Sequence, residues 1–263
     1  MSEDAVLLDV EEEIATITLN RPEMRNAITH EVSTTLLDRL DEVEDSDARA
    51  LVVTGSGGSF SAGGDVNAMS ARLSGEASLA ESVRRIHQET SRAIERVAKF
   101  HLPTVAKIDG VAFGAGANLA LACDVQLASR EASISFGFKQ VGLAVDTGTS
   151  YFLPRIVGMN KAKELVFTGE LLDADDAHEL GLFNHVYGDD FEGEVDAFVE
   201  ELAQGPTVAL ETSKRALVQG LEQSLDQAMT REAAHQAAVF ETDDHREGAT
   251  AFMEKREPDF SGE

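Results

Sequence analysis

Two glycine-rich loops, each lying between an apolar run and a helical pattern, constrain this chain most. The first loop, residues 60–65, reads Phe-Ser-Ala-Gly-Gly-Asp and follows the apolar run at 50–53. The second, residues 114–118, reads Gly-Ala-Gly-Ala-Asn and follows the run at 104–108. Small residues let a backbone approach a ligand closely, and the first turn of a helix has N–H groups without intrahelical partners. Two such loops facing one another would aim two amides at one oxygen atom, which predicts chemistry on a carbonyl group.

The second loop by itself has two other interpretations. Gly114 and Gly116 after a strand begin a dinucleotide fingerprint, which would indicate a nicotinamide cofactor. Leu119 argues against it, because a bulky residue stands where the third glycine is required for close helix–strand packing. Structural glycine turns that bind no ligand are the second alternative.

The apolar periodicity predicts an α/β core followed by helices. Strands and helices alternate in a strand–strand–helix rhythm up to about residue 160, and the pattern is mostly helical after it. Such a helical trailer often packs over a neighbouring subunit, so we expect an oligomer. The predicted strands are 5–10, 14–19, 49–53, 104–109, 124–128 and 132–136, and the predicted helices are 29–44, 75–100, 115–122, 160–168, 173–180, 189–204, 206–220, 223–241 and 244–255.

The net charge of −26 excludes one class of partner. Phosphate backbones repel so acidic a surface, so we expect no nucleic-acid partner. A cytoplasm rich in potassium salt would screen the self-repulsion, and we interpret the charge as a halophilic adaptation. The lone Cys123 excludes an internal disulfide and fits a reducing compartment as a core thiol. With no apolar run long enough for a bilayer and no secretion signal, we expect a cytoplasmic protein without a membrane partner.

A series of short motifs runs in a fixed order from about residue 5 to residue 260. The motifs are Asn20-Arg21-Pro22 with Asn26-Ala27, residues 60–65, Gly110 with Gly114-Ala115-Gly116, Ala122-Cys123-Asp124, Leu153-Pro154-Arg155 with Gly158, Thr168-Gly169, Ala177 with Gly181-Leu182, and Phe252 with Lys255-Arg256. Together they resemble the crotonase superfamily, the enoyl-CoA hydratase/isomerase family. In motif, the chain is most similar to the ring-1,2-epoxyphenylacetyl-CoA isomerases of that family.

This resemblance implies an α/β crotonase (ClpP/crotonase-like) fold, a spiral of ββα units with a C-terminal helical region. Residues 1–200 would form the spiral core with the CoA and active sites, and residues 201–263 the helical trimerisation region. It implies a homotrimer or a dimer of trimers acting on an acyl-CoA thioester. Coenzyme A would enter as part of the substrate, with no permanently bound cofactor. The sequence has no metal-ligand spacing, so we expect no metal.

The resemblance also assigns site residues. The peptide N–H groups of Ala62 and Ala115 would form an oxyanion hole for the thioester oxygen. Phe252 and Lys255 would contact the adenosine phosphate end of coenzyme A, often from the next subunit. The substrate-binding residues implied in this way are Arg25, Ala27, Gly64, Asp65, Val66, Gly114, Asn118, Phe138, Phe252 and Lys255.

The acid–base residue decides the reaction. Hydratases of the family use two glutamates, but Asn118 and Phe138 stand at those positions here, and neither transfers protons. Asp146 falls where the epoxyphenylacetyl-CoA isomerases carry an aspartate. We predict that Asp146 moves a proton between carbons of a CoA-bound enolate, with its pKa raised by an apolar wall of Phe138 and Leu143.

Several alternatives stay open on the sequence alone. Asp146 could simply cap a helix that begins near Thr147. The protein could be an enoyl-CoA hydratase of fatty-acid or aromatic-acid degradation, or a non-catalytic homologue that binds CoA thioesters. The sequence does not specify the acyl group.

The acidic surface generates a stability prediction. Potassium ions screen repulsion among the 48 acidic side chains, which outnumber 22 lysines and arginines, so we expect the melting temperature to rise toward molar KCl. Thermal unfolding followed by circular dichroism in a KCl series measures this effect. A melting temperature that stays constant across the series contradicts the halophilic interpretation.

Overall fold

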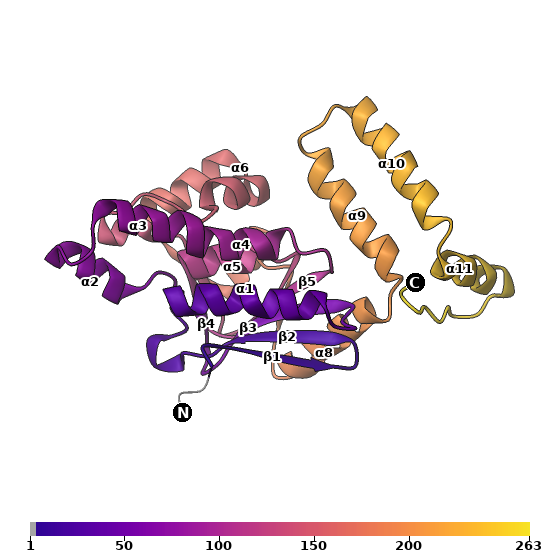
Figure 1. Cartoon of the computed structure of the whole chain (residues 1–263), viewed down its shortest axis with the longest axis horizontal. Coiled ribbons are helices and arrows are strands. Elements are labelled where there is room, and N and C mark those ends of the chain that lie inside the picture. The colour runs from indigo at the N-terminus through magenta and orange to yellow at the C-terminus, as the bar shows by residue number, and fades with distance from the viewer. Residues whose placement is uncertain (1–3) are drawn as a thin grey trace.

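The larger of two β-sheets is mostly parallel (Figure 1). The computed structural model describes residues 4–263 and orders this sheet β1-β2-β3-β5-β7-β10. β1 pairs with β2 as the predicted antiparallel hairpin, with Val6 opposite Leu19, and the other neighbours are parallel. The strands are β1 Val6–Glu11, β2 Ile14–Leu19, β3 Ala50–Gly55, β5 Thr104–Ile108, β7 Val125–Ser129 and β10 His185–Tyr187.

A second sheet has the order β4-β6-β8-β9. Its strands are β4 Ser59–Ser61, β6 Val111–Phe113, β8 Ser133–Ser135 and β9 Leu171–Asp173. Along the chain β4 follows β3, β6 follows β5 and β8 follows β7, and a helix comes after each pair. The predicted strand–strand–helix architecture is therefore confirmed. β4, β6, β9 and β10 were not predicted, and a run of three residues is too short to show a period. β8 is equally short, and it lies within the predicted strand 132–136.

Helices follow the strand pairs and continue to the C-terminus. Their bounds are α1 His30–Glu44, α2 Val66–Ser74, α3 Leu79–Arg85, α4 Ser91–Ala98, α5 Ala115–Ala122, α6 Thr149–Thr168, α7 Ala174–Glu179, α8 Phe191–Ala203, α9 Thr207–Gly220, α10 Leu225–Val239 and α11 Asp243–Glu254, with the 3₁₀ turns η1 Pro22–Met24 and η3 Phe138–Val141 and the π-helical segment η2 Ile86–Thr90.

The helix predicted over residues 75–100 begins later than expected. Gly75 ends α2 in a left-handed conformation, with φ 81°. Ser78 then begins α3 with a capping box, in which its hydroxyl and the Glu81 side chain each accept a backbone N–H. α6 is also longer than predicted. The predicted helix, 160–168, is only its second half, and an interruption at Gly158, where φ is 75°, separates it from a first half that begins at Thr149.

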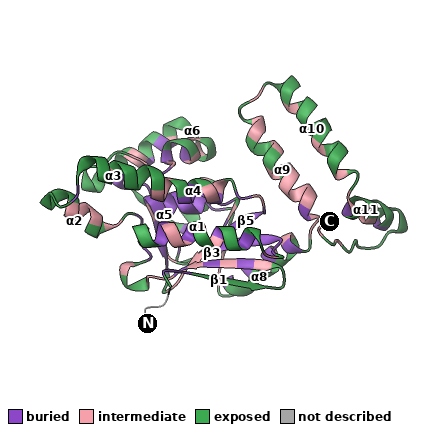
Figure 2. Ribbon diagram, in the orientation of Figure 1, coloured by how far each residue is buried: buried purple, intermediate pink, exposed green. Residues whose placement is uncertain are grey.

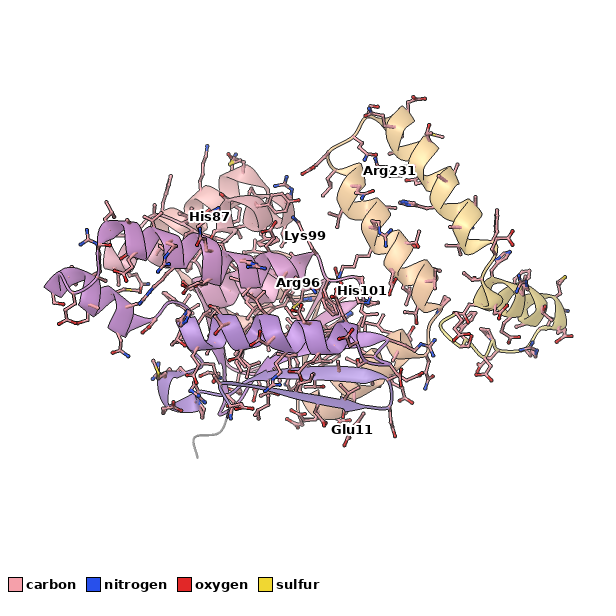
Figure 3. All side chains as sticks on the ribbon, in the orientation of Figure 1. Glu11, His87, Arg96, Lys99, His101 and Arg231 are labelled. Carbon is pink, nitrogen blue, oxygen red and sulfur yellow. The ribbon has the colours of Figure 1, made fainter. Side chains whose placement is uncertain are left out.

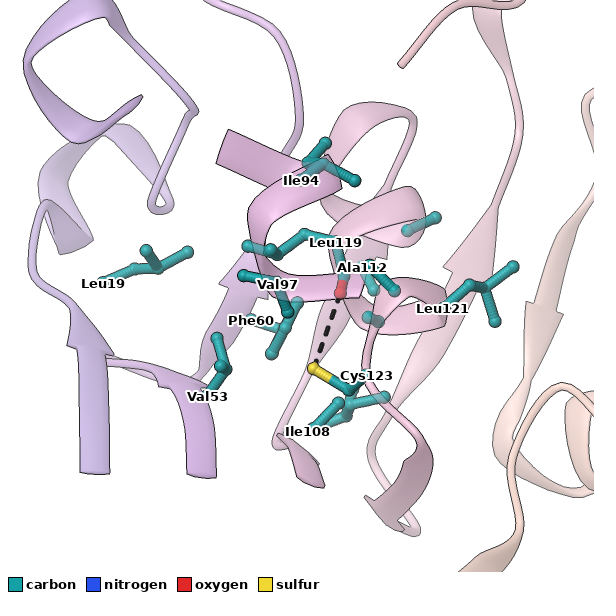
Figure 4. Packing of buried hydrophobic residues seen from close by; sticks show 14 of the residues in the cluster. Leu19, Val53, Phe60, Ile94, Val97, Ile108, Ala112, Leu119, Leu121 and Cys123 are labelled. Atoms are coloured by element: carbon teal, nitrogen blue, oxygen red, sulfur yellow. Dashed lines mark hydrogen bonds between the residues drawn. The ribbon is translucent and has the colours of Figure 1, made fainter. Parts of the chain in front are cut away.

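The main apolar core surrounds α5 (Figure 4). All residues of this helix are buried, and Leu119 packs in one cluster with Phe60, Ile94 and Val97 from neighbouring elements. Cys123 lies in the same cluster, and burial raises the pKa of its thiol far above the ordinary range. The prediction of an unreactive core thiol is confirmed. α8 covers the other face of the larger sheet through a second cluster that includes Val52, Val105 and Val199.

The C-terminal helices α9, α10 and α11 extend away from the core (Figure 1), and much of their surface is exposed (Figure 2). Arg231 on α10 donates to Gln219 on α9 at 2.6 Å and links these two helices (Figure 3). Buried Arg49 fixes the base of the region, since it donates to Gly205 O at 2.7 Å, Thr207 Oγ1 at 2.9 Å and Phe260 O at 3.2 Å. No helix within residues 4–263 is long and apolar enough to cross a membrane.

Candidate active site

The two predicted glycine loops contact one another. A Cβ added to Gly116, in the first turn of α5, would stand 2.5 Å from the carbonyl oxygen of Ser61 in β4. A Cβ added to Gly63 would stand 2.3 Å from the carbonyl oxygen of Phe113 and 3.3 Å from the nitrogen of Ala115. No side chain fits at either glycine, so the loops approach at backbone distance. The prediction that they face one another is confirmed.

The N-terminus of α5 presents free amide groups to this contact. Gly114 is the N-cap, with φ 54° and ψ −115°, and no side chain caps the helix. Ala115 is the first helical residue, and its N–H has no acceptor among the described residues. Its φ is negative, as the prediction for an alanine here requires. The free N–H groups and the helix dipole together favour an anion beside Ala115.

The structure corrects the assignment of the second amide. The Ala62 N–H donates to the carbonyl oxygen of Arg25 at 2.8 Å, so it is already occupied. Gly64 offers the alternative. In its parallel bridge with Ile28, the Ile28 N–H donates to Gly63 O at 2.7 Å, so the N–H of Gly64 itself points away from Ile28. Gly64 is exposed, and its N–H has no acceptor within residues 4–263.

Buried Asn26 holds the segment that precedes the first loop. Arg25 and Asn26 both have left-handed backbones, with φ 50° and 55°. The Asn26 amide donates to Ser56 O at 2.8 Å and to Ser59 O at 2.7 Å. This conformation turns the Arg25 carbonyl toward Ala62, leaves the Arg25 side chain exposed and buries Ala27. Arg25 and Ala27 therefore lie beside the first loop.

The acidic residues at the ends of these strands have structural roles. Asp65 caps α2 by accepting the N–H of Asn67 at 2.8 Å, and Val66 follows it with 71% of its surface exposed. Asp124 accepts the N–H of Thr104 at 2.7 Å and pairs with Lys214.

Asn118 holds the turn that carries Asp146. Asn118 is fully buried, and the two hydrogens of its Nδ2 face three oxygens, Asp146 O at 3.0 Å, Thr147 Oγ1 at 2.7 Å and Thr149 Oγ1 at 2.8 Å. The Thr147 hydroxyl in turn donates to Asp146 Oδ1 at 3.2 Å. Asn118 therefore lies next to the predicted acid, in the turn after Ala115 on the same helix.

Asp146 does not cap a helix through its side chain. α6 begins at Thr149 with Gly148 as its N-cap, and no side chain caps it. Partial burial raises the pKa of the Asp146 carboxyl, and the hydrogen bond from Thr147 opposes this rise. The capping alternative is therefore wrong, and the raised pKa agrees with the prediction.

Phe138 supplies an apolar contact at the second loop. Its ring lies 3.7 Å from where a Cβ on Gly114 would stand, and 8% of the residue is exposed. Leu143, the other residue of the predicted apolar wall, leaves 49% of its surface exposed. Of the two residues, only Phe138 is therefore buried.

Phe252 and Lys255 lie far from the loops within one chain. Phe252 lies on α11 and Lys255 is its C-cap, and α11 is at the opposite end of the molecule from α2 (Figure 1). Phe252 leaves 85% of its surface exposed. Arg256 is paired locally with Glu247 and Glu254, and its contact with Glu247 lowers the pKa of that carboxyl to about 2. Lys255 therefore remains the side chain of this basic pair that is available to an anion.

Sequence reasoning missed two contributors to the site. Gly64 was predicted to bind substrate, but its N–H was not predicted to be an oxyanion donor. The hydroxyls of Thr147 and Thr149 were not predicted at all. The run Asp-Thr-Gly-Thr at 146–149 was the available signal, because hydroxyl residues around a glycine favour local side-chain hydrogen bonds.

Other features of the molecule lie outside this site. A cleft of about 590 Å³ lies between the β1–β2 hairpin and α8, away from the glycine loops, and acidic residues such as Asp9 and Glu200 line it. His87 is exposed on η2, and His101 follows α4 near the surface (Figure 3). Within residues 4–263, no group of acidic, histidine or cysteine side chains is arranged to hold a metal.

Comparison with known proteins gives one consistent family. A family model described as enoyl-CoA hydratase/isomerase matches residues 9–263. The 1,2-epoxyphenylacetyl-CoA isomerase of Escherichia coli K12 is 36% identical over 260 residues, covering 98% of each chain. The crotonyl-CoA hydratase of Syntrophomonas wolfei is 35% identical over 265 residues, covering 99% of each.

The fold agrees with solved structures of the same kind. The crystal structure of an enoyl-CoA hydratase/isomerase from Cupriavidus metallidurans CH34 superposes with a TM-score of 0.90 at 35% identity. The match covers 100% of this chain and 98% of that one.

The contact between the loops generates a prediction about stability. Gly116→Ala forces a methyl group against the Ser61 backbone, and we expect it to lower the free energy of unfolding by about 1–3 kcal/mol. Gly220→Ala is the matched control, because a Cβ there meets nothing within 4 Å and alanine favours the helix. Denaturant unfolding of both variants measures the difference. Equal stabilities would contradict the close approach.

Proposed function

This chain belongs to the enoyl-CoA hydratase/isomerase family, a family of enzymes with the crotonase fold, and from that premise we propose that it isomerises an enoyl- or epoxy-acyl-CoA. The N–H groups of Ala115 and Gly64 hold the thioester oxygen, and Asp146 carries the proton. The observation that carries the proposal is the contact of the two loops, which brings the N–H groups of Gly64 and Ala115 to one place. The Asp146 carboxylate lies nearby, on the turn that Asn118 of α5 holds.

The chemistry follows from these three groups. When a base removes a proton beside the thioester carbonyl, negative charge develops on its oxygen, and two preorganised amides stabilise it. Asp146 takes the proton and returns it to another carbon of the same molecule. Its raised pKa suits the task, because a carboxyl that titrates closer to neutral pH is a stronger base when ionised.

Asn118 favours isomerisation over hydration. Hydration by the two-glutamate route of the family needs a second proton-carrying group, and a carboxamide does not titrate. The Asn118 amide is moreover fully engaged by the turn at Asp146. The relatives do not decide between the reactions, since an isomerase and a hydratase are 36% and 35% identical to this chain. Enoyl-CoA hydratase and a non-catalytic CoA-thioester binder are the alternatives.

Coenzyme A would lie along Arg25, Ala27 and the 64–66 segment, as the family resemblance implies. We assign Phe252 and Lys255 to a neighbouring copy, because α11 lies far from the loops of its own chain. The helical region 201–263, on which Leu217, Leu221 and Leu225 each leave at least 67% of their surface exposed, would trimerise the 1–200 core into a homotrimer or a dimer of trimers in the cytoplasm.

The assignment of Asp146 is tested with Asp146→Asn. This variant keeps the side-chain shape and loses the base, so we expect turnover to fall by at least about 100-fold. The assay incubates a panel of enoyl- and epoxy-acyl-CoA thioesters in deuterated buffer of high potassium content. Mass spectrometry then separates isomers, hydrated products and deuterium incorporated at the α or γ carbon.

Four results of that assay are informative. Isomer formation that depends on Asp146 supports the proposal, and hydrated product from the parent protein supports the hydratase. A parent protein that binds the thioesters without product or exchange is a binder. Full isomerase turnover in Asp146→Asn would remove that residue from the mechanism.

The amide of Gly64 is tested by removing its hydrogen. Gly64→Pro has no N–H, and we expect kcat to fall about 10²–10³-fold. Gly64→Ala is the matched control, since it keeps the N–H and its Cβ meets only Met69 at 3.5 Å. Thermal unfolding confirms that both variants fold. If a folded Gly64→Pro turns over as fast as Gly64→Ala, another group completes the oxyanion hole.

A further inference from the structure

The hydrogen bonds around Asp146 have a fixed direction. The carbonyl oxygen of Asp146 can only accept, so the Asn118 atom that contacts it is the amide nitrogen. That nitrogen can only donate, so the Thr147 hydroxyl accepts from it and keeps its own hydrogen for another partner. Asp146 Oδ1, 3.2 Å from the hydroxyl, is the acceptor. The buried amide thereby directs a hydroxyl hydrogen at the carboxylate.

The backbone of this turn is strained. Thr147 has φ 48°, a left-handed conformation that branched side chains rarely adopt, and 7% of the residue is exposed. Such strain persists only where neighbouring contacts hold it, and here the Asn118 amide bonds to oxygens of Asp146, Thr147 and Thr149. The turn therefore has one held arrangement rather than several.

We propose that Asn118 and Thr147 are positioning residues for Asp146, which fix one carboxylate oxygen through the Thr147 hydroxyl and leave the other for the substrate. The inference rests on the proposed role of Asp146 as the proton carrier. Asp146 Oδ2 has no hydrogen-bond partner among the described residues, which agrees with this division of roles. Asn118 acts on the reaction through the turn and carries no proton itself.

Thr147 is the polar group that shifts the pKa of Asp146. Burial raises the pKa of the carboxyl, and the Thr147 hydroxyl lowers it. α5 has no ionisable group, η3 has Lys139, and α6 has Tyr151, Arg155, Lys161, Lys163 and Glu164. None of these groups is among the causes of the shift in this pKa. Removing the hydroxyl should raise the pKa further, so that ionisation of Asp146 requires higher pH.

Thr147→Val tests the proposal, because it keeps the branched shape and removes the hydroxyl. We expect the pKa of Asp146 to rise by about one pH unit, since a hydrogen bond to a charged group has that magnitude. Carbon-13 NMR of the protein labelled at aspartate carboxyls measures the titration, and Asp146→Asn identifies the resonance. The acid limb of the kcat/KM profile should move to higher pH by the same amount.

Three further variants serve as checks. Thr147→Ser restores the hydroxyl and should restore the parental pKa of Asp146. Thr147→Ala removes the hydroxyl and relieves the branched strain, so it reports the same shift if Thr147→Val does not fold. Thr168→Val makes the same change at the exposed far end of α6 and should leave the titration unmoved.

The outcomes separate this proposal from the proposed function. An Asp146 titration identical in Thr147→Val, Thr147→Ala and the parent protein overturns the positioning role, whatever the turnover. Full turnover in Asp146→Asn overturns the catalytic role instead, and the carboxyl titration still reports the hydrogen bond.

Discussion

The site depends on the approach of α5 to β4 at a distance that excludes any side chain. Gly116 lies against the Ser61 backbone, and Gly63 lies beside the nitrogen of Ala115. The apolar core holds the rest of α5 in place. Every residue of this helix is buried, and Leu119 packs in one cluster with Phe60, Ile94 and Val97. A helix held at backbone distance on one side and in a packed core on the other has little freedom to move. Its free N-terminal amides are therefore preorganised.

The same helix also positions the acid. Ala115 and Asn118 are three residues apart on α5, so both lie on one face of the helix. The first offers its backbone N–H, and the second holds the turn at residues 146–149 through its side chain. One turn of helix thereby sets the distance between the proposed oxyanion donor and the proposed base. In the proposed mechanism, the carboxamide at position 118 serves by holding this turn and transfers no proton.

Sequence reasoning succeeded where the signal was local. The long apolar strands and the two glycine loops could be read from residue type and spacing, whereas Asn118 and Asp146 were indicated by the family resemblance. Sequence reasoning failed where a distant segment decided the outcome: the Arg25 carbonyl occupies the Ala62 N–H, and no local pattern distinguishes that amide from the one at Gly64. The left-handed backbone of Thr147 is equally invisible, because branched residues almost never adopt it. The relation of Phe252 and Lys255 to the site cannot be read from one chain at all.

The strong negative charge affects how an anionic substrate is recognised. A surface of net charge −26 repels a CoA ester at long range, so attraction must arise close to the site. Arg256 contributes little to it, because Glu247 and Glu254 already pair with its guanidinium. Groups that stay available to the proposed substrate include the N–H groups at the N-terminus of α5, the Gly64 N–H and the exposed side chains of Arg25 and Lys255. Backbone amides suit this role, because they bring positive potential to a few ångströms without adding a charge that nearby carboxylates would neutralise. Potassium salt would strengthen the same design, since it screens the distant repulsion and leaves contacts shorter than a Debye length largely intact.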